Sequence, residues 1–269
     1  SRVLSLQNVM MEFATIQLSR NIANILKFQI LSSGPKQING STRTFSLKHH
    51  EGQFQGLPLV VILMINILDL GYGNSASIAN TLDSIGYPYE LISKPAQLHK
   101  GVLIIPGVGS ILAFNQELSK KNWSKSIKQY AHSGNNVIGI CLGFHALTAH
   151  SEESNGMKCM GFLGSSVKTI IVDKENKRSN TGWAPFFISK QFLEQAKWNP
   201  YFGRSRKQSL QGRVFYNHRY GVMAPENTFI PISEREKYAS LMIKGNFMGI
   251  QFHPEKSQEF GRSILEFIL

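Results

Sequence analysis

Short apolar runs that end at glycine-containing turns are the feature that most restricts the fold of this chain. The longest run spans residues 57–70, but it holds only about a dozen apolar residues before Asp69 and is interrupted by Asn66. A helix that crosses a bilayer needs about 20 apolar residues, so we expect no membrane-spanning segment and no membrane partner. The β-branched residues of the run and the glycine turn after it predict a buried strand of a parallel sheet.

Strands and helices are expected to alternate between residues 64 and 150. Strands are expected at 64–69, at 89–92, within 102–110 and at 137–140, and a helical period passes through Ile78, Leu82 and Ile85. Further helices are expected at about 111–120, about 123–133 and from Cys141 to about His150. Such alternation is typical of an α/β fold whose sheet is covered on both faces. After residue 165 strands dominate, at 166–172, 213–217, 227–232, 238–243 and 247–252, before a last helix at about 257–267.

Residues 1–63 differ from the rest of the chain. They contain a turn-rich stretch, LSSGPKQINGST at 31–42, show only a weak helical period, and carry six Lys or Arg against two Asp or Glu. Residues 1–20 lack the charged start, apolar middle and small-residue cleavage site of a signal peptide. We therefore expect residues 1–63 to be an atypical extension, flexible or loosely docked, and residues 64–269 to form the functional domain.

Of the formal net charge of +12, residues 64–269 carry +8, and most of this surplus lies in one segment. Nine basic and two acidic residues lie between Lys174 and Arg213, which predicts either a solvated basic loop or a docking surface for an acidic partner or anionic substrate. Aromatic residues are interspersed there, but without the spacing of a nucleic-acid motif, so no nucleic-acid partner is expected. The two cysteines form no disulfide framework, which favours a reducing, cytoplasmic location.

GICLG, residues 139–143, predicts a nucleophile. An apolar strand runs into a turn with a glycine on each side of Ile140-Cys141-Leu142, as in the nucleophile elbow of hydrolases, with cysteine in place of serine. The amino terminus of the following helix favours the thiolate form. A buried structural cysteine is the alternative. Cys159 has no such setting, and we expect it to have a structural or surface role.

QFHPE, residues 251–255, predicts a base and the group that orients it. On an extended chain His253 and Glu255 face the same side, and Pro254 biases His253 towards that extended geometry. The carboxylate could then orient the imidazole, which would activate a thiol from another strand. The alternative is a structural histidine at a strand end. Because the elbow and this pair each follow an apolar strand, we expect a Cys141-His253-Glu255 triad.

These motifs resemble those of a known family. GICLG, SEESNG (151–156) and GIQFHPEKS (249–257), with LDLGYGN (68–74) and PGVG (106–109) upstream, are similar to the motifs of class I glutamine amidotransferases. Within that class they are most similar to the glutaminase subunit of imidazole glycerol phosphate synthase. The resemblance covers about residues 64–269 and implies a flavodoxin-like three-layer sandwich. Its central sheet would be mostly parallel, with extra antiparallel strands in the C-terminal half.

The resemblance also implies a reaction and its residues. Cys141 would attack the side-chain amide of L-glutamine, giving L-glutamate and ammonia, and the ammonia would pass to a separate (β/α)8 synthase subunit in a heterodimer. No cofactor and no metal are expected. The other residues implied are an oxyanion hole at Leu142 and at Val108 or Gly109, substrate contacts at Gly107, Gly143, His145, His218 and Tyr220, and a partner interface at Trp183, Phe215 and Lys256.

Departures from the family pattern leave the partner open. His145 stands where the family usually has Gln, and Phe215 where it usually has Tyr. The segment 179–184, usually Pro-His-Met-Gly-Trp-Asn, keeps only its glycine and Trp183. The chain could serve histidine biosynthesis, or it could be a paralogue that supplies ammonia for amino sugars of surface polysaccharide. A third hypothesis is a non-catalytic or weakly catalytic subunit that only docks a synthase.

Overall fold

A seven-stranded sheet organises the part of the chain that the computed structural model describes, residues 64–71, 73–170, 179–223, 229–233 and 235–269. Five strands run parallel, in the order β13-β4-β3-β1-β2, and β12 and β11 continue the sheet antiparallel beyond β13. Their bounds are β1 Met64–Leu68, β2 Tyr89–Ile92, β3 Gly101–Gly107, β4 Asn136–Cys141, β11 Phe229–Ile232, β12 Arg235–Lys244 and β13 Phe247–Ile250.

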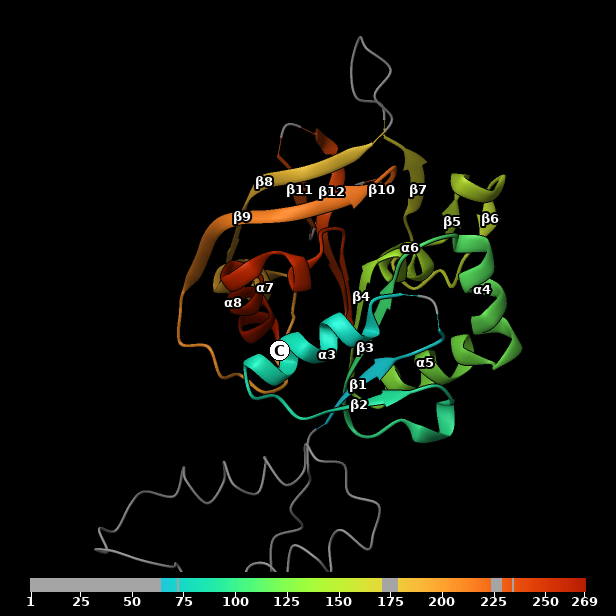
Figure 1. Ribbon diagram of the computed structural model, residues 1–269, viewed down its shortest axis with the longest axis horizontal. Helices are drawn as coiled ribbons and strands as arrows, with labels where there is room; N and C mark the ends of the chain where they lie inside the picture. Colours follow the sequence, from blue (N-terminus) through green and yellow to red (C-terminus); the bar gives the residue numbers. More distant parts are fainter. Residues whose placement is uncertain (1–63, 72, 171–178, 224–228, 234) are drawn as a thin grey trace, which may run out of the picture. The chain divides into compact units, whose positions relative to one another are not determined.

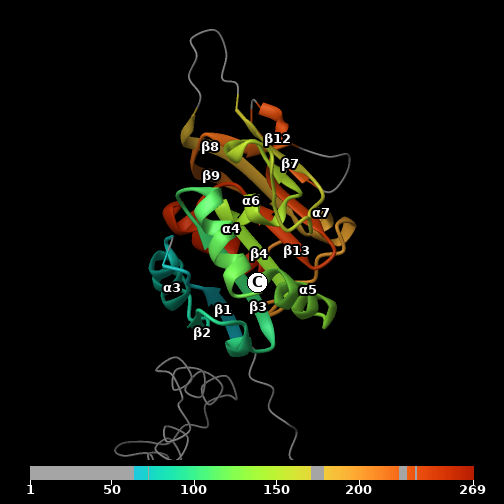
Figure 2. The ribbon, with the colours of Figure 1, turned by 90° about the vertical axis from the view of Figure 1, so that its right-hand side faces the viewer.

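Helices cover both faces of this sheet. Helices α3 (Ser75–Ser84) and α8 (Gln258–Ile268) lie on one side, and α4 (Ile111–Lys120) and α5 (Trp123–His132) on the other (Figures 1 and 2). The short helix α6 (Leu142–Leu147) follows β4 directly. This arrangement confirms the predicted α/β fold with a mostly parallel central sheet and antiparallel strands in the C-terminal half.

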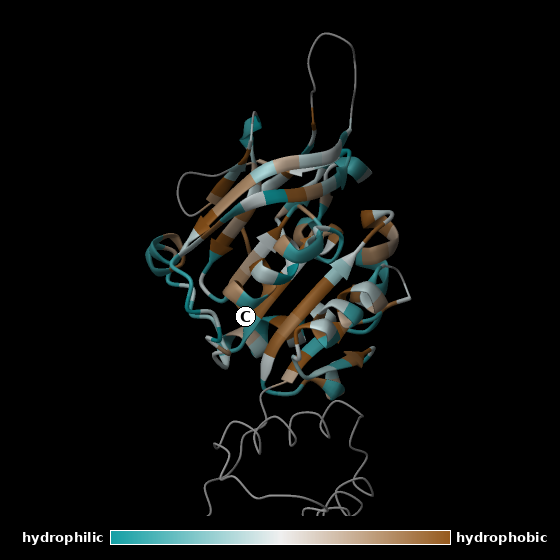
Figure 3. Cartoon of the chain, turned by 60° about the vertical axis from the view of Figure 1, so that its left-hand side comes forward, coloured by the Kyte–Doolittle hydropathy of each residue, from teal (hydrophilic) through white to brown (hydrophobic). Residues whose placement is uncertain are grey.

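The core lies in the central strands. Every residue of β1, β3 and β4 is buried, as expected for parallel strands with helices on both faces, and Figure 3 shows these strands largely in the hydrophobic colour. Asn66 is the polar exception within β1. Its side-chain amide donates to the carbonyl oxygens of His99 and Val102 and to the hydroxyl of Tyr130, so its burial leaves the amide nitrogen satisfied.

The C-terminal half adds two smaller sheets beside the central one. One has the order β10-β7-β5-β6, and the other is a long ribbon of β8 and β9 paired antiparallel over ten residues each. The additional elements are β5 His150–Ser151, β6 Met157–Lys158, β7 Ser166–Thr169, β8 Asn180–Ser189, β9 Ser209–His218, β10 Tyr220–Val222, α7 Lys190–Gln195 and the 3₁₀ turns η1 Pro95–Gln97, η2 Glu152–Ser154 and η3 Pro254–Lys256.

Three sequence expectations need correction. The helix expected from Cys141 to about His150 ends at Leu147, because Thr148 is extended at φ −74°, ψ 178° and His150 begins β5. Strand β8 was not predicted, since its polar and apolar residues do not alternate regularly. The basic segment is therefore not simply a solvated loop, because its residues 180–189 and 209–213 pair in the ribbon.

Two further expectations concern membrane spans and the domain boundary at residue 64. None of the helices in the described ranges is both long and apolar enough to span a membrane. The predicted extension at residues 1–63 lies outside the described residues, so the boundary at residue 64 stays a prediction.

Candidate active site

Cys141 lies at a strained turn between β4 and α6. Its backbone has φ 53° and ψ −104°, a conformation that non-glycine residues rarely adopt. Two glycines permit the close packing around it. A Cβ on Gly143 would lie 1.8 Å from the carbonyl oxygen of Ile105, and one on Gly139 would lie 2.6 Å from that of Gly143. The predicted elbow is thus present, and it holds the thiol at the carboxyl end of β4.

His253 and Glu255 meet Cys141 from the end of β13. Nδ1 of His253 donates to Oε1 of Glu255 at 2.7 Å, and the Cys141 side chain lies near enough to the His253 ring to raise its pKa. The route to this geometry differs from the predicted one. Only His253 is extended, at φ −102°, ψ 96°, whereas Pro254–Lys256 form the 3₁₀ turn η3. A helical turn, rather than a strand, therefore brings the carboxylate under the ring.

The surroundings of His253 favour its protonated form. Burial lowers the pKa of His253, but hydrogen bonds to Cys141 and Glu255 and the charges of both groups outweigh burial and raise that pKa to about 10. The ring is 1% exposed and the Glu255 side chain is fully enclosed. The imidazole is therefore protonated at neutral pH, with a sulfur on one side and a carboxylate on the other.

A cavity of about 260 Å³ opens onto the Cys141 side of this group. Its size suits a molecule as small as an amino acid. Six predicted oxyanion or substrate residues line it together with Cys141, and three unpredicted residues complete the lining. The full set is Val108, Gly109, Cys141, Leu142, His145, Glu153, Asn217, His218, Arg219 and Tyr220.

The two predicted glycines are not among the lining residues. Gly143 packs against the carbonyl of Ile105, and a Cβ on Gly107 would meet Cβ of Leu142 at 2.9 Å. Both positions therefore need glycine because backbone segments cross closely there. Gly109 has φ +98°, a left-handed conformation that suits glycine, and follows Val108, which is 39% exposed.

Two buried histidines of the cavity are neutral. Burial lowers the pKa of His145 to about 4 and that of His218 to about 3. In His218 both ring nitrogens are engaged: Nδ1 donates to the Tyr220 carbonyl at 2.7 Å, and Nε2 accepts from the Asn180 amide at 2.9 Å. Its ring therefore offers no free nitrogen to a ligand.

His145 differs from His218 in this respect. Its Nε2 lies 3.0 Å from Oε1 of Gln251 and donates to it, so Nδ1 carries the lone pair. This Nδ1 is buried and has no hydrogen-bond partner among the described residues. The lone pair of this nitrogen is therefore unsatisfied among the described residues.

Sequence reasoning missed four residues of the site. Glu153 and Asn74 lie in the quoted motifs SEESNG and LDLGYGN, but no role was drawn from either motif. Asn217 and Arg219 flank His218 at the end of β9. The Asn74 side chain donates to Oε1 of Glu255, the same oxygen that His253 contacts. The motifs carried the signal for Glu153 and Asn74, whereas Arg219 had none.

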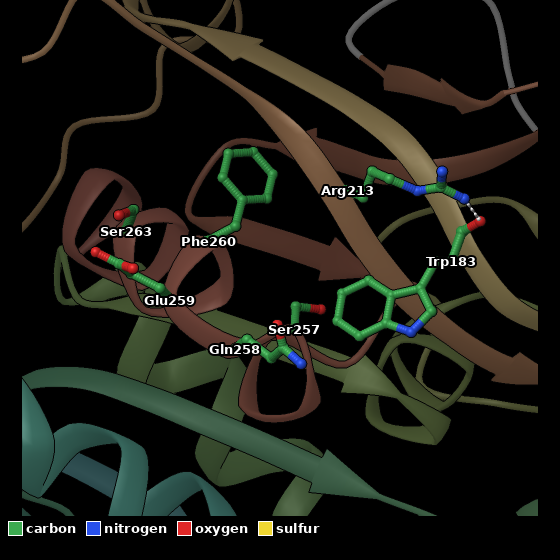
Figure 4. A pocket seen from close by; sticks show the side chains of 7 residues that line it. All are labelled: Trp183, Arg213, Ser257, Gln258, Glu259, Phe260 and Ser263. Carbon is green, nitrogen blue, oxygen red and sulfur yellow. Dashed lines mark hydrogen bonds between the residues drawn. The ribbon is translucent and has the colours of Figure 1, made fainter.

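The predicted interface residues gather on the ribbon and on η3. Trp183, 40% exposed, makes an edge-to-face contact with Phe215 at 5.8 Å between ring centroids. Figure 4 shows the Trp183 indole beside Ser257 in a second cavity, of about 680 Å³, with the Arg213 guanidinium donating to the Trp183 carbonyl. The backbone of Phe215 reaches the base, because its carbonyl accepts from the His253 N–H at 2.9 Å. Lys256 follows on η3, with its side chain exposed.

No group of three or more His, Cys, Asp or Glu side chains in the described ranges is arranged to hold a metal ion. The chemistry that the arrangement supports is nucleophilic attack by a thiolate with a protonated imidazole as general acid.

Comparison with known proteins identifies the class. The family description "Glutamine amidotransferase class-I" matches residues 66–268, nearly the whole of the described fold. The chain therefore belongs to the class I glutamine amidotransferases, an enzyme class, as its motifs indicated.

Its relatives narrow the likeness within that class. The chain is 32% identical over 209 residues to imidazole glycerol phosphate synthase subunit HisH of Desulfitobacterium hafniense (strain DSM 10664 / DCB-2), which covers 76% of this chain and 92% of the relative. It is 31% identical over 206 residues to the subunit HisH of Listeria monocytogenes serovar 1/2a, covering 76% and 93%. It is thus a HisH-like member of the class.

Solved structures agree on the fold. PurLQS from Thermotoga maritima gives a TM-score of 0.55 at 14% identity, covering 76% of this chain and 97% of that one. A solved glutamine amidotransferase gives 0.55 at 16% identity, covering 76% and 98%. At these identities the likeness bears on the fold alone.

Proposed function

We propose that this chain is a glutaminase subunit that hydrolyses L-glutamine to L-glutamate and ammonia through a thioester on Cys141. The observation that carries the proposal is the chain of contacts from Cys141 through His253 to Glu255 at the wall of an amino-acid-sized cavity. Membership of the class I glutamine amidotransferases supports glutamine as the substrate.

The proposed reaction has two steps. The Cys141 thiolate adds to the carboxamide carbon of glutamine, and the C–N bond breaks as His253 gives its proton to the departing nitrogen, which leaves as ammonia. The neutral His253 then takes a proton from water, whose oxygen attacks the thioester and releases glutamate and the thiolate. Glu255 keeps the ring oriented and stabilises its positive charge.

Stabilisation of the oxyanion is assigned to two backbone segments. The N–H of Leu142, at the start of α6, would donate to the oxyanion, as the corresponding N–H does in other nucleophile elbows. The second donor would come from Val108 or Gly109, which line the same cavity. The left-handed Gly109 lets the peptide before it turn with little steric resistance.

The ammonia is proposed to pass to a separate (β/α)8 synthase subunit. Relatives of this chain are named as subunits of imidazole glycerol phosphate synthase, which supports a two-subunit arrangement in histidine biosynthesis. Trp183, Phe215 and Lys256 would form the docking surface, since the first two present aromatic area on the ribbon and the third a cation beside it. A cytoplasmic location, consistent with two free cysteines, is part of this proposal.

The decisive experiment compares two cysteine variants in the presence of the synthase. Cys141→Ala should lose glutamine-dependent synthesis by at least about a thousandfold, yet support synthesis from an ammonium salt. Cys159→Ala, which alters the other cysteine, should keep both activities. Glutamate release from glutamine that persists in Cys141→Ala, or that is absent from the unaltered complex, would reject the catalytic proposal and leave only a docking subunit.

Which acceptor receives the ammonia is tested separately. Reconstitution with the histidine-pathway synthase of the same organism should give glutamine-dependent product, and Trp183→Ala should weaken the complex. If that reconstitution fails and one with a polysaccharide-pathway synthase succeeds, the chain is instead the paralogue that supplies ammonia for amino sugars. The changes at residues 179–184 suggested this alternative.

A further inference from the structure

The cavity beside Cys141 is lined by one basic and one carboxylic side chain besides the sulfur. Apart from Cys141, its ionisable lining side chains include one basic residue, Arg219, and one carboxylic acid, Glu153, while burial holds His145 and His218 neutral. Burial raises the pKa of Glu153, but its Oε1 still accepts a hydrogen bond from the Ile111 N–H at 3.3 Å. A ligand with both charges would match this pair.

Arg219 is held at the cavity by its neighbours. Its backbone carbonyl accepts from the Ile170 N–H at 3.1 Å, and its guanidinium carbon lies 6.0 Å from the ring centroid of Tyr220, another lining residue. None of the ion pairs formed by described residues includes Arg219. Among the described residues, therefore, no carboxylate competes with a ligand for this guanidinium.

The other cation of the site is already paired. The His253 ring lies between Cys141 and Glu255 and is 1% exposed, so it is not available to a second anion. A carboxylate bound at the cavity wall would therefore turn to Arg219, whose planar guanidinium can bind it through two parallel hydrogen bonds.

We infer that Arg219 binds the α-carboxylate of the substrate and sets the preference of this chain for a free amino acid over a substrate whose α-carboxyl is blocked. The inference rests on the proposed glutaminase function and deepens it. Arg219 has a role in binding, not in bond breaking, so its loss should affect KM and leave kcat nearly unchanged.

A binding experiment in the Cys141→Ala background tests the inference without turnover and without the synthase. Calorimetry would compare L-glutamine with L-glutamine α-amide, in which the carboxylate is replaced by a neutral group. Adding Arg219→Ala should weaken L-glutamine about tenfold and leave the α-amide unchanged, since a charged hydrogen bond contributes about that factor. Arg219→Lys should recover part of the loss.

A matched arginine serves as the control. Arg206→Ala removes an exposed arginine that does not line the cavity and should change neither ligand. High salt should weaken L-glutamine binding more in the parent than in Arg219→Ala, because screening acts on the ion pair.

The outcomes separate the two claims. If the parent binds glutamine and Arg219→Ala binds it equally well, the inference is wrong while the glutaminase proposal stands. An equal loss for both ligands would also overturn it, because Arg219 would then only support the cavity wall. If neither the parent binds glutamine nor the unaltered complex releases glutamate, the proposed function itself fails.

Discussion

Oxygen Oε1 of Glu255 receives two hydrogen bonds, one from His253 and one from Asn74. The second bond fixes the carboxylate from α3, whose first residue follows Asn74 directly. Gly73, the residue before it, packs close to the backbone of Gly107, so the same loop also contacts the end of β3 that leads to the proposed oxyanion donors.

We expect Asn74→Ala to lower kcat about tenfold and to change KM for glutamine little, because supporting hydrogen bonds around a catalytic group typically contribute that much. The reason is a loss of orientation of Glu255, not a loss of substrate contacts. Steady-state glutamate release with the synthase measures both constants. Asn80→Ala, on the exposed side of the same helix, is the control and should behave like the parent protein.

Site residues could be predicted from the sequence where a local pattern surrounds them, and not where only tertiary structure brings them to the site. Cys141 and His253 could be predicted because each lies in a local pattern, with glycines around Cys141 and a proline after His253. Arg219 and Glu153 belong to the site only because loops from β9 and η2 converge on one cavity, and no local pattern encodes that convergence.

At the scale of elements, the β4–α6 elbow depends on glycines that no other residue can replace. The Gly143→Ala methyl would lie 1.8 Å from the Ile105 carbonyl oxygen, so β3 and α6 would have to separate. We expect a loss of about 2–3 kcal/mol in the free energy of unfolding, as for other overpacked interiors, and a loss of glutaminase activity. Urea denaturation measures the first effect and glutamate release the second.

Gly245→Ala is the matched control for that variant. This glycine has φ +57° and open space around it, so alanine should cost only about 1 kcal/mol of backbone strain and leave activity intact. Equal destabilisation by the two substitutions would show that close packing at the elbow is not the cause.

Element prediction followed hydrophobic patterning closely. Strand β2 was placed at its observed bounds, and α4 and α5 to within a residue, because their apolar residues repeat with the period of the element. Strand β8, the partner of β9 in the ribbon, was not predicted because both of its faces mix polar and apolar residues. The turn η3 was not predicted because Pro254 is equally compatible with an extended chain and with the first residue of a helical turn.

For the whole molecule, buried neutral histidines make stability depend on pH. His145 and His218 stay neutral in the folded state down to about pH 4 and 3, whereas in the unfolded chain they take up protons below about pH 6.5. The unfolded state therefore binds more protons in this window, and the free energy of unfolding falls as the pH is lowered from 6.5 towards 4.

His145→Gln tests this dependence. Each such histidine contributes a slope of about 1.4 kcal/mol per pH unit once its unfolded form is protonated, so the variant should have a shallower acid limb by about that amount. Urea denaturation between pH 6.5 and 4 gives the slope. An unchanged slope would mean that His145 is protonated in the folded state. His253 acts in the opposite direction: its raised pKa adds stability that is complete below pH 6.5 and is lost as the pH rises through 10.

The predicted extension, residues 1–63, raises the question of whether it contributes to the stability and activity of the whole chain. If residues 1–63 are an appendage, a chain that starts at Met64 should unfold at the same urea concentration as the full chain and release glutamate at the same rate. A lower midpoint would contradict the expected boundary and assign residues 1–63 to the folded domain.

The exposure of Trp183 has a practical consequence. The sequence holds three tryptophans, of which Trp123 is fully buried and Trp198 is 4% exposed with its indole nitrogen bonded to the carbonyl of Ile268. Only the emission of Trp183, at 40% exposure, should respond to a change of solvent at the ribbon. The chain thus carries an intrinsic fluorescent reporter, and titration with a synthase could be followed by a blue shift without any attached dye.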